Sequence, residues 1–86
     1  MNIGRTERFK RAYKKLPSSD KERVRKAIAQ LLEDFRYPAL QVKRIRGTAS
    51  IWEARVSLGC RVTFELDGNT ILLRTISEHN ATLKNP

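Results

Sequence analysis

Residues 51–79 read IWEARVSLGCRVTFELDGNTILLRTISEH, and apolar and polar side chains alternate along most of this segment. The alternation is strict over residues 52–56 and again over 60–66. A period of two over such lengths is typical of strands that bury one face. Glycine-containing turns at 57–59 and 67–69 separate the runs. The segment therefore predicts three consecutive strands with one apolar face and one polar face.

The two turns predict how these strands pair. A three-residue loop at 57–59, with Gly59 at a positive φ, would place Val56 opposite Cys60. A second loop would be centred on Gly68-Asn69. A shift by one residue would put apolar side chains opposite charges, so the alternation supports this register. The further predicted pairs are Ala54–Val62, Trp52–Phe64, Leu66–Ile71, Phe64–Leu73 and Val62–Thr75.

The polar face of the predicted sheet would carry an unusual group of cations. Arg55 would lie directly opposite Arg61, with Arg74 diagonal to Arg61, Glu53 nearby and His79 at the edge. Like charges in opposed positions are destabilising, and arginine forks suit phosphate, so the group favours an anion-binding site. The alternative is a set of solvated strand residues paired with neighbouring glutamates. The predicted rows are Glu53–Thr63–Arg74 and Arg55–Arg61–Ile76.

Two helical segments precede these strands. Thr6 is a candidate N-cap for the first, which Pro17 ends, and Ser19 and Glu22 form a capping-box pattern for the second. A hairpin of the two helices would cover the apolar face of the sheet. With a short strand at 1–5 and an edge segment near Val42, the pattern predicts an α+β fold. The apolar positions at helical spacing are Phe9, Ala12, Tyr13 and Leu16, then Val24, Ala27, Ile28, Leu31, Leu32 and Phe35.

Length and charge restrict the function classes. Eighty-six residues fit a single domain, 1–86, with one small core. The net charge of +9 lies in the first 46 residues, which hold 14 Lys/Arg and 5 Asp/Glu, whereas residues 47–86 hold 4 of each. Such a distribution favours a nucleic acid or an acidic protein as partner. Basic helices that serve solubility alone are the alternative.

Several other classes are disfavoured. No apolar run approaches the roughly 18 residues of a membrane span, and no signal-peptide pattern is present. A single cysteine provides neither a disulfide framework nor a thiol metal site, which favours the cytoplasm. Cys60 falls on the apolar face of its strand and is expected to be a core residue. We expect no metal and no cofactor.

Six basic residues are candidates for binding RNA or the ribosome. Those that precede Gly47 could follow a phosphate backbone, although solvated charges that protect a sheet edge are nearly as good an interpretation. The others surround the apolar positions of the first helix. The two clusters are Lys43, Arg44 and Arg46, and Arg11, Lys14 and Lys15.

The residues on the polar face permit a modest class of chemistry. The chain has no glycine-rich phosphate loop, no histidine pair at metal-binding spacing and no Ser/His/Asp order. RNA cleavage by its own 2′-hydroxyl needs a base, an acid and cations beside the charged phosphorane, and it needs no metal. His79 is the only histidine and, with a usual pKa near about 6.5, could serve in either proton role. A lone histidine is more often structural.

The order of these motifs resembles the RelE/ParE superfamily, the toxins of type II toxin–antitoxin modules. The most specific parts are Trp52–Phe64, within I-W-E-A-R-V-S-x-G-x-R-x-T-F, and Arg74–Pro86, within I-L-L-R-x-x-x-x-H-N-x-x-L-K-N-P. The resemblance implies a helical hairpin packed on one face of a curved, mainly antiparallel sheet. RelE-like members cleave mRNA in the ribosomal A site, ParE-like members inhibit DNA gyrase, and a cognate antitoxin holds both inactive.

The resemblance also implies site residues. Arg55, Arg61 and His79 occupy positions that the nuclease members use, and Arg74 matches an arginine that RNA-cleaving relatives carry on the last strand. Glu53 stands where relatives have one of two strand lysines. The chain departs from the family at three further positions, where relatives often carry Tyr, Asp, and Tyr or Phe: Cys60, Asn80 and Leu83. The departures retain the arginines and leave the identity of the base and the acid open.

These inferences give one hypothesis and two rivals. The hypothesis is a cytoplasmic toxin that cleaves mRNA on the ribosome without a metal, with an antitoxin, the ribosome and mRNA as partners. The first rival is a gyrase inhibitor that acts by protein binding. The second is a basic RNA-binding domain without turnover. A titrating group beside the arginines favours the nuclease, because a pure binder needs none.

Overall fold

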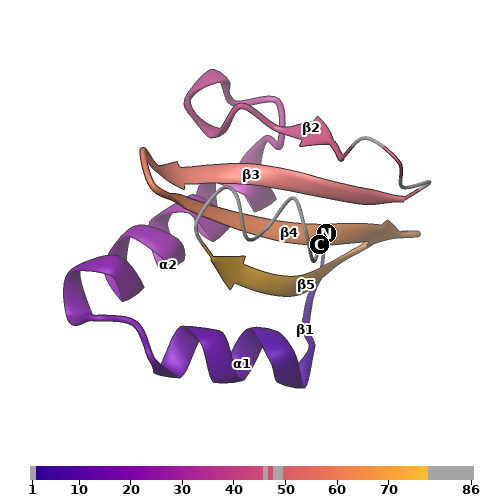
Figure 1. Ribbon diagram of the computed structural model, residues 1–86. Helices are drawn as coiled ribbons and strands as arrows, with labels where there is room; N and C mark the ends of the chain where they lie inside the picture. Colours follow the sequence, from indigo (N-terminus) through magenta and orange to yellow (C-terminus); the bar gives the residue numbers. More distant parts are fainter. Residues whose placement is uncertain (1, 46, 48–49, 78–86) are drawn as a thin grey trace.

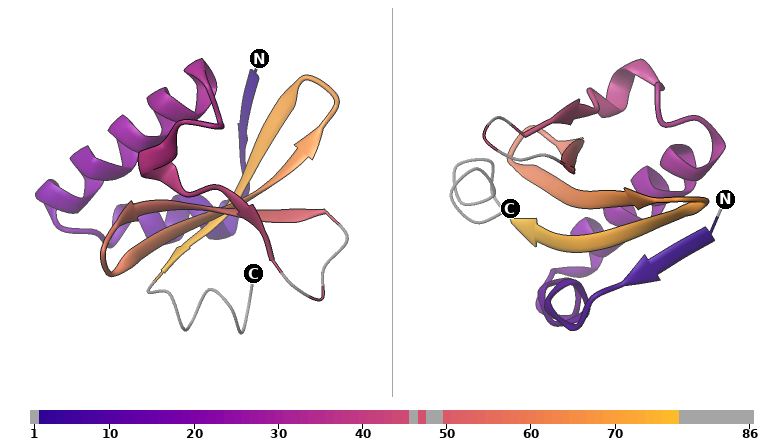
Figure 2. Two further views of the ribbon diagram at one scale, coloured as in Figure 1. Left: turned by 90° about the horizontal axis from the view of Figure 1, so that it is seen from above. Right: turned by 90° about the vertical axis from the view of Figure 1, so that its right-hand side faces the viewer.

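Five strands form one mixed sheet in the order β1-β5-β4-β3-β2 (Figure 1). The computed structural model describes residues 2–45, 47 and 50–77. Strand β1 pairs parallel with β5, whereas all other neighbours are antiparallel, and the sheet is strongly twisted (Figure 2). The α+β class is therefore confirmed. The elements are β1 (Asn2–Arg5), α1 (Glu7–Lys14), α2 (Ser18–Glu33), the 3₁₀ helix η1 (Pro38–Leu40), β2 (Lys43–Arg44), β3 (Ile51–Ser57), β4 (Cys60–Asp67) and β5 (Thr70–Ser77).

Helix α1 begins as the sequence predicts, but α2 does not. The Thr6 hydroxyl accepts a hydrogen bond from the backbone N–H of Phe9 at 3.1 Å, so Thr6 is the N-cap of α1. The capping box predicted for Ser19 and Glu22 is wrong. Helix α2 begins two residues earlier, at Ser18, its N-cap is Pro17, and no side chain caps it. Ser19 consequently lies inside the first turn.

The two helices cover one face of the sheet and form the core with it. Helix α1 packs against β5, and α2 packs against β3 (Figure 1). Leu32, predicted to belong to the apolar stripe of α2, is instead 37% exposed. No helix in the described part of the chain is both long and apolar enough to cross a membrane. The buried core residues are Phe9, Val24, Ala27, Ile28, Leu31, Leu40, Ala54, Val62, Phe64, Ile71, Leu73 and Ile76.

The pairing of β3 with β4 matches the prediction along the strands and differs at the turn. Ala54–Val62, Trp52–Phe64 and Arg55–Arg61 are confirmed. Cys60, however, pairs with Ser57, and the register shifts between Arg55 and Ser57. The extra residue, Val56, shortens the loop to two residues, and Gly59 does not have the predicted positive φ. The predicted pair Val56–Cys60 is therefore wrong.

Strand β5 contains a bulge at Arg74. Leu66–Ile71 and Phe64–Leu73 pair as predicted, and Gly68 has the positive φ of a tight turn, +58°. Beyond Leu73 the register shifts, so Val62 pairs with Ile76 and Arg61 with Ser77. The shift turns Ile76 towards the core, where it is buried. The predicted rows are thus corrected to Glu53–Thr63–Thr75 and Arg55–Arg61–Ser77.

Candidate functional site on the polar face of the sheet

Glu53 is the buried centre of the polar face. Its side chain is 1% exposed, and it lies in a row with Thr63 and Thr75, which are also buried. Its Oε1 atom is 3.5 Å from Lys43 Nζ on β2 and 4.0 Å from Arg61 Nε on β4. Its Oε2 atom is buried and accepts no hydrogen bond within the described residues. Burial of a carboxylate costs free energy unless cations lie close to it. Glu53 therefore holds Lys43 and Arg61 close.

Arg61 is fixed at the β3–β4 turn. Its Nη1 atom donates to the carbonyl oxygens of Ser57 at 2.9 Å and Cys60 at 3.3 Å, with Leu58 O at 3.5 Å. The Arg61 side chain is only 14% exposed. The sequence predicted Arg61 on the polar face of the sheet, and there its guanidinium closes the turn as well as facing Glu53. Its orientation is therefore set before any ligand arrives.

Arg55 lies opposite Arg61 but has different neighbours. Its side chain lines a cleft of about 370 Å³ between α2, η1 and the end of β3. Within the described residues Arg55 forms no ion pair, whereas Arg61 faces Glu53. The repulsion expected from two opposed arginines is reduced because Arg61 is bound to turn carbonyls and a carboxylate.

Arg74 is held on the same face by a different carboxylate. Its guanidinium donates to Glu65 of β4, which is paired in register with Leu72. The bulge that presents Arg74 is fixed by Thr6, whose hydroxyl donates to the Arg74 carbonyl at 2.8 Å. Thr6 N–H also donates to the Leu73 carbonyl at 3.1 Å. Arg74 and Arg61 thus share the polar face but pair with different glutamates.

The six basic candidates fall into separate places. Lys43 and Arg44 form the exposed edge strand β2, and Lys43 belongs to the Glu53 cluster. Arg11 and Lys14 lie on α1 and Lys15 caps its C-terminus, beside β5 and thus towards the other edge of the sheet. The two groups therefore cannot form one continuous patch around Glu53. Arg46 and His79 lie outside the described residues.

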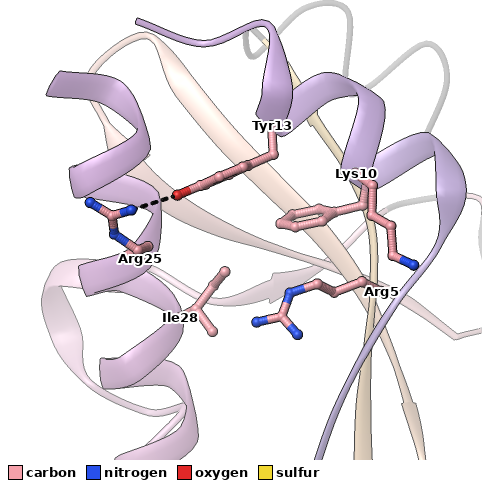
Figure 3. A pocket seen from close by; sticks show the side chains of 6 residues that line it. Arg5, Lys10, Tyr13, Arg25 and Ile28 are labelled. Carbon is pink, nitrogen blue, oxygen red and sulfur yellow. Dashed lines mark hydrogen bonds between the residues drawn. The ribbon is translucent and has the colours of Figure 1, made fainter. Parts of the chain in front are cut away.

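Besides the cleft lined by Arg55, a basic hollow lies between the two helices (Figure 3). It has a volume of about 230 Å³, an apolar floor and three cationic side chains at its rim. Arg25 donates to the Tyr13 hydroxyl at 3.2 Å, which joins α2 to α1. Arg5 forms no ion pair within the described residues. The lining residues are Arg5, Phe9, Lys10, Tyr13, Arg25 and Ile28.

Cys60 is poorly suited to act as a nucleophile. It is partly buried against the core, and burial raises the pKa of its thiol. The nearby Asp20 raises this pKa further, and Arg61 lowers it by less. A raised pKa reduces the fraction of reactive thiolate. We expect iodoacetamide to alkylate Cys60 near neutral pH more slowly than free cysteine, as followed by mass spectrometry. Alkylation of the folded protein at the rate of free cysteine would contradict this assignment.

The described part of the face can stabilise negative charge. Four cations, Lys43, Arg55, Arg61 and Arg74, accompany two carboxylates, Glu53 and Glu65. Among the described residues, no group of three or more His, Cys, Asp or Glu side chains lies close enough to bind a metal ion. The sequence did not single out Thr6 as the support of the Arg74 bulge. An N-cap signal alone cannot reveal a contact 68 residues away.

Solved structures match this chain in fold. No family model and no curated protein sequence matches it. A chain of the RelB–RelE antitoxin–toxin complex from Methanococcus jannaschii has a TM-score of 0.75 at 19% identity, covering 96% of this chain and 99% of that one. The YoeB/ParE toxin from Agrobacterium tumefaciens has a TM-score of 0.79 at 14% identity, covering 92% and 99%.

Further toxins show the same likeness. The YoeB dimer from Staphylococcus aureus has a TM-score of 0.69 at 24% identity, covering 92% of this chain and 97% of that one. YafQ from Escherichia coli matches with a TM-score of 0.75 at 13% identity, covering 94% and 96%. At these identities the likeness is one of fold. The chain has the fold of the RelE-like toxins, as the motifs at 52–64 and 74–86 implied.

Proposed function

We propose that this chain is the toxin of a type II toxin–antitoxin module and cleaves mRNA on the ribosome. One observation carries the proposal: the buried Glu53 carboxylate and three turn carbonyls hold Arg61 in a fixed orientation on a cationic strand face. A guanidinium fixed before the reaction stabilises developing phosphorane charge better than one that must reorient. The RelE-like fold supports the same function, because solved structures of this fold include toxins.

The proposed reaction is an in-line attack by the RNA itself. The 2′-hydroxyl loses a proton and attacks the adjacent phosphorus, the bond from phosphorus to the 5′ oxygen breaks, and that oxygen gains a proton. The products are a 2′,3′-cyclic phosphate and a 5′-hydroxyl end. Arg61, Arg55 and Arg74 would stabilise the phosphorane, and His79 would transfer a proton. Glu53 is too deeply buried to meet the RNA, so we assign it the positioning of Lys43 and Arg61.

The experiment that tests the proposal is primer extension on a reporter mRNA after expression of the chain. Cleavage should appear as discrete stops inside translated codons, and removal of the start codon should abolish them. Intact reporter mRNA together with inhibited DNA supercoiling would instead indicate the gyrase inhibitor. An intact mRNA without a supercoiling defect would indicate a binding domain without turnover.

We also propose an acidic antitoxin segment as the protein partner. Neighbouring folds were solved as RelB–RelE and DinJ–YafQ complexes, and the hollow between α1 and α2 presents Arg5, Lys10 and Arg25 around an apolar floor. An amphipathic segment could place apolar side chains on Phe9 and carboxylates beside the cations.

Salt should therefore weaken the complex with the antitoxin. Raising ionic strength from about 0.01 M to about 0.15 M shortens the Debye length from about 30 Å to about 8 Å. We expect a higher Kd and a slower association rate, as measured by surface plasmon resonance. Arg5→Ala should reduce this salt dependence, whereas Arg44→Ala, on the exposed edge strand β2 and outside the lining of the hollow, serves as the matched control. A Kd independent of salt would show that charge does not attract the partner.

A further inference from the structure

The cleft beside Arg55 is separate from the Glu53 cluster and from the hollow between the helices. Residues of α2, the turn around η1 and the end of β3 line its volume of about 370 Å³, which lies within the range of ligand-binding pockets. Leu40 of η1 is buried beneath the turn and anchors it to the core. The cleft is therefore built on fixed elements of the fold.

The cleft is cationic and contains no carboxylate among its described lining residues. Arg23 and Lys26 lie three residues apart on α2, and Arg55 lies on β3. Arg23 pairs with Asp20 at 3.2 Å, but Lys26 and Arg55 form no ion pair within the described residues. Two cations from different elements thus lie in one cleft without a counterion among the described residues. An anion is the ligand that such a cleft would bind.

Tyr37 adds an aromatic surface at the rim. Tyr37 is 42% exposed and is the one aromatic residue among the exposed large hydrophobic residues in the described part of the chain. No other described ring stacks on it. Tyr37 also borders a second hollow of about 280 Å³ with Phe35 and Trp52. Nucleic-acid bases stack on exposed aromatic rings next to backbone-binding cations in single-strand binding sites.

The turn that carries Tyr37 is held in one conformation. Leu40 N–H donates to the Tyr37 carbonyl at 3.0 Å, and Gln41 N–H donates to the Pro38 carbonyl at 3.1 Å. Gln41 has a φ of +44° and is the one non-glycine residue with positive φ in the described part of the chain. Backbone strain of this kind is retained where the surrounding structure fixes it, often at ligand sites.

We propose that this cleft binds a nucleotide of single-stranded RNA, with Lys26 and Arg55 on the phosphate and Tyr37 stacked on the base. The proposal rests on the function proposed above, because Arg55 belongs to both the cleft and the polar face. The bound nucleotide would flank the scissile phosphate. An acidic protein segment would satisfy the cations but would leave the exposed ring of Tyr37 without a role.

Equilibrium binding of an uncleavable RNA tests the proposal. The probe is a fluorescently labelled 2′-O-methyl oligouridine, followed by anisotropy with the full chain and no ribosomes. Tyr37→Ala should weaken binding roughly 5- to 150-fold, which is the range measured for a lost stacking contact, whereas Tyr37→Phe should bind like the parent. Lys26→Ala should also weaken binding and lower the salt slope by about 0.7 to 1. An abasic probe should be insensitive to Tyr37→Ala but not to Lys26→Ala.

Lys21→Ala is the matched control, because Lys21 lies on the same helix and outside the lining of the cleft. Parent-like affinity of both Tyr37→Ala and Lys26→Ala would overturn the proposal. So would variants that keep RNA binding and lose the antitoxin, since the cleft would then bind protein. A chain that binds RNA through the cleft but cleaves none would refute the proposed function and leave this inference standing. Circular dichroism and thermal melts exclude unfolding as a cause.

Discussion

Arg61→Ala is expected to lower the single-turnover rate of ribosome-bound mRNA cleavage by about 10²–10³-fold. The magnitude is that of removing one preorganised donor from a site that stabilises developing negative charge. Arg61→Lys should lie between the variant and the parent, because lysine keeps the charge but lacks the planar fork. Quench-flow with saturating toxin measures the rate without interference from product release.

The same substitution should also destabilise the fold. It removes donors to the Ser57 and Cys60 carbonyls and leaves Lys43 as the remaining ion-pair partner of buried Glu53 among the described residues, so we expect a loss of roughly 1–3 kcal/mol. Glu53→Gln in the Arg61→Ala background removes the uncompensated charge and should recover part of that stability without recovering cleavage. Recovery of cleavage together with stability would show that Arg61 acts only through folding.

His79→Gln is expected to lower single-turnover cleavage by about 10²–10⁴-fold, the range for a lost general acid or base. His79 lies outside the described residues, so this proposal rests on sequence alone: it is the only histidine and follows the strand that carries Arg74. Glutamine retains hydrogen bonding but transfers no proton near neutrality. The variant should also lose the pH dependence of the rate near neutral pH.

Ribosome binding separates the interpretations of this variant. If His79 transfers a proton, sedimentation of the variant with ribosomes should match the parent while cleavage falls. A variant that cleaves at the parent rate with the parent pH profile would leave the proton transfers to other groups. A variant with an altered melting transition would assign His79 a structural role.

The alternation in 51–66 predicts the sheet because it reflects burial of one face, which dominates the energetics of a small fold. It gives the Arg55–Arg61 opposition and most of the β3–β4 register correctly. It fails at Val56, and the period-two pattern of the last strand fails at Arg74, because one extra residue enters each strand there. A pattern of period two cannot indicate where a bulge inserts an extra residue into a strand. The sequence TILLRTIS did contain a signal, because only a bulge lets Leu73 and Ile76 share the core.

The sequence predicted which described residues lie on the polar face, but it did not predict how deeply they are buried or which groups they contact. The alternation placed Glu53 and Arg61 on the polar face but did not indicate that both are nearly buried, because burial of a charge depends on what surrounds it in three dimensions. The cleft for which we propose nucleotide binding was missed for a related reason. Lys26, Tyr37 and Arg55 lie on three elements, and nothing in their spacing along the chain indicates that they line one cleft.

The chemistry of the cut ends tests the proposed mechanism most directly. A synthetic mRNA is positioned in the ribosomal A site and incubated with the chain in EDTA, with ribosomes stabilised beforehand by polyamines. We expect a 5′-hydroxyl end and a 2′,3′-cyclic or 3′-phosphate end, and no cleavage when the scissile nucleotide is 2′-deoxy. Cleavage of the 2′-deoxy substrate, or a product with a 3′-hydroxyl end, would contradict attack by the 2′-hydroxyl.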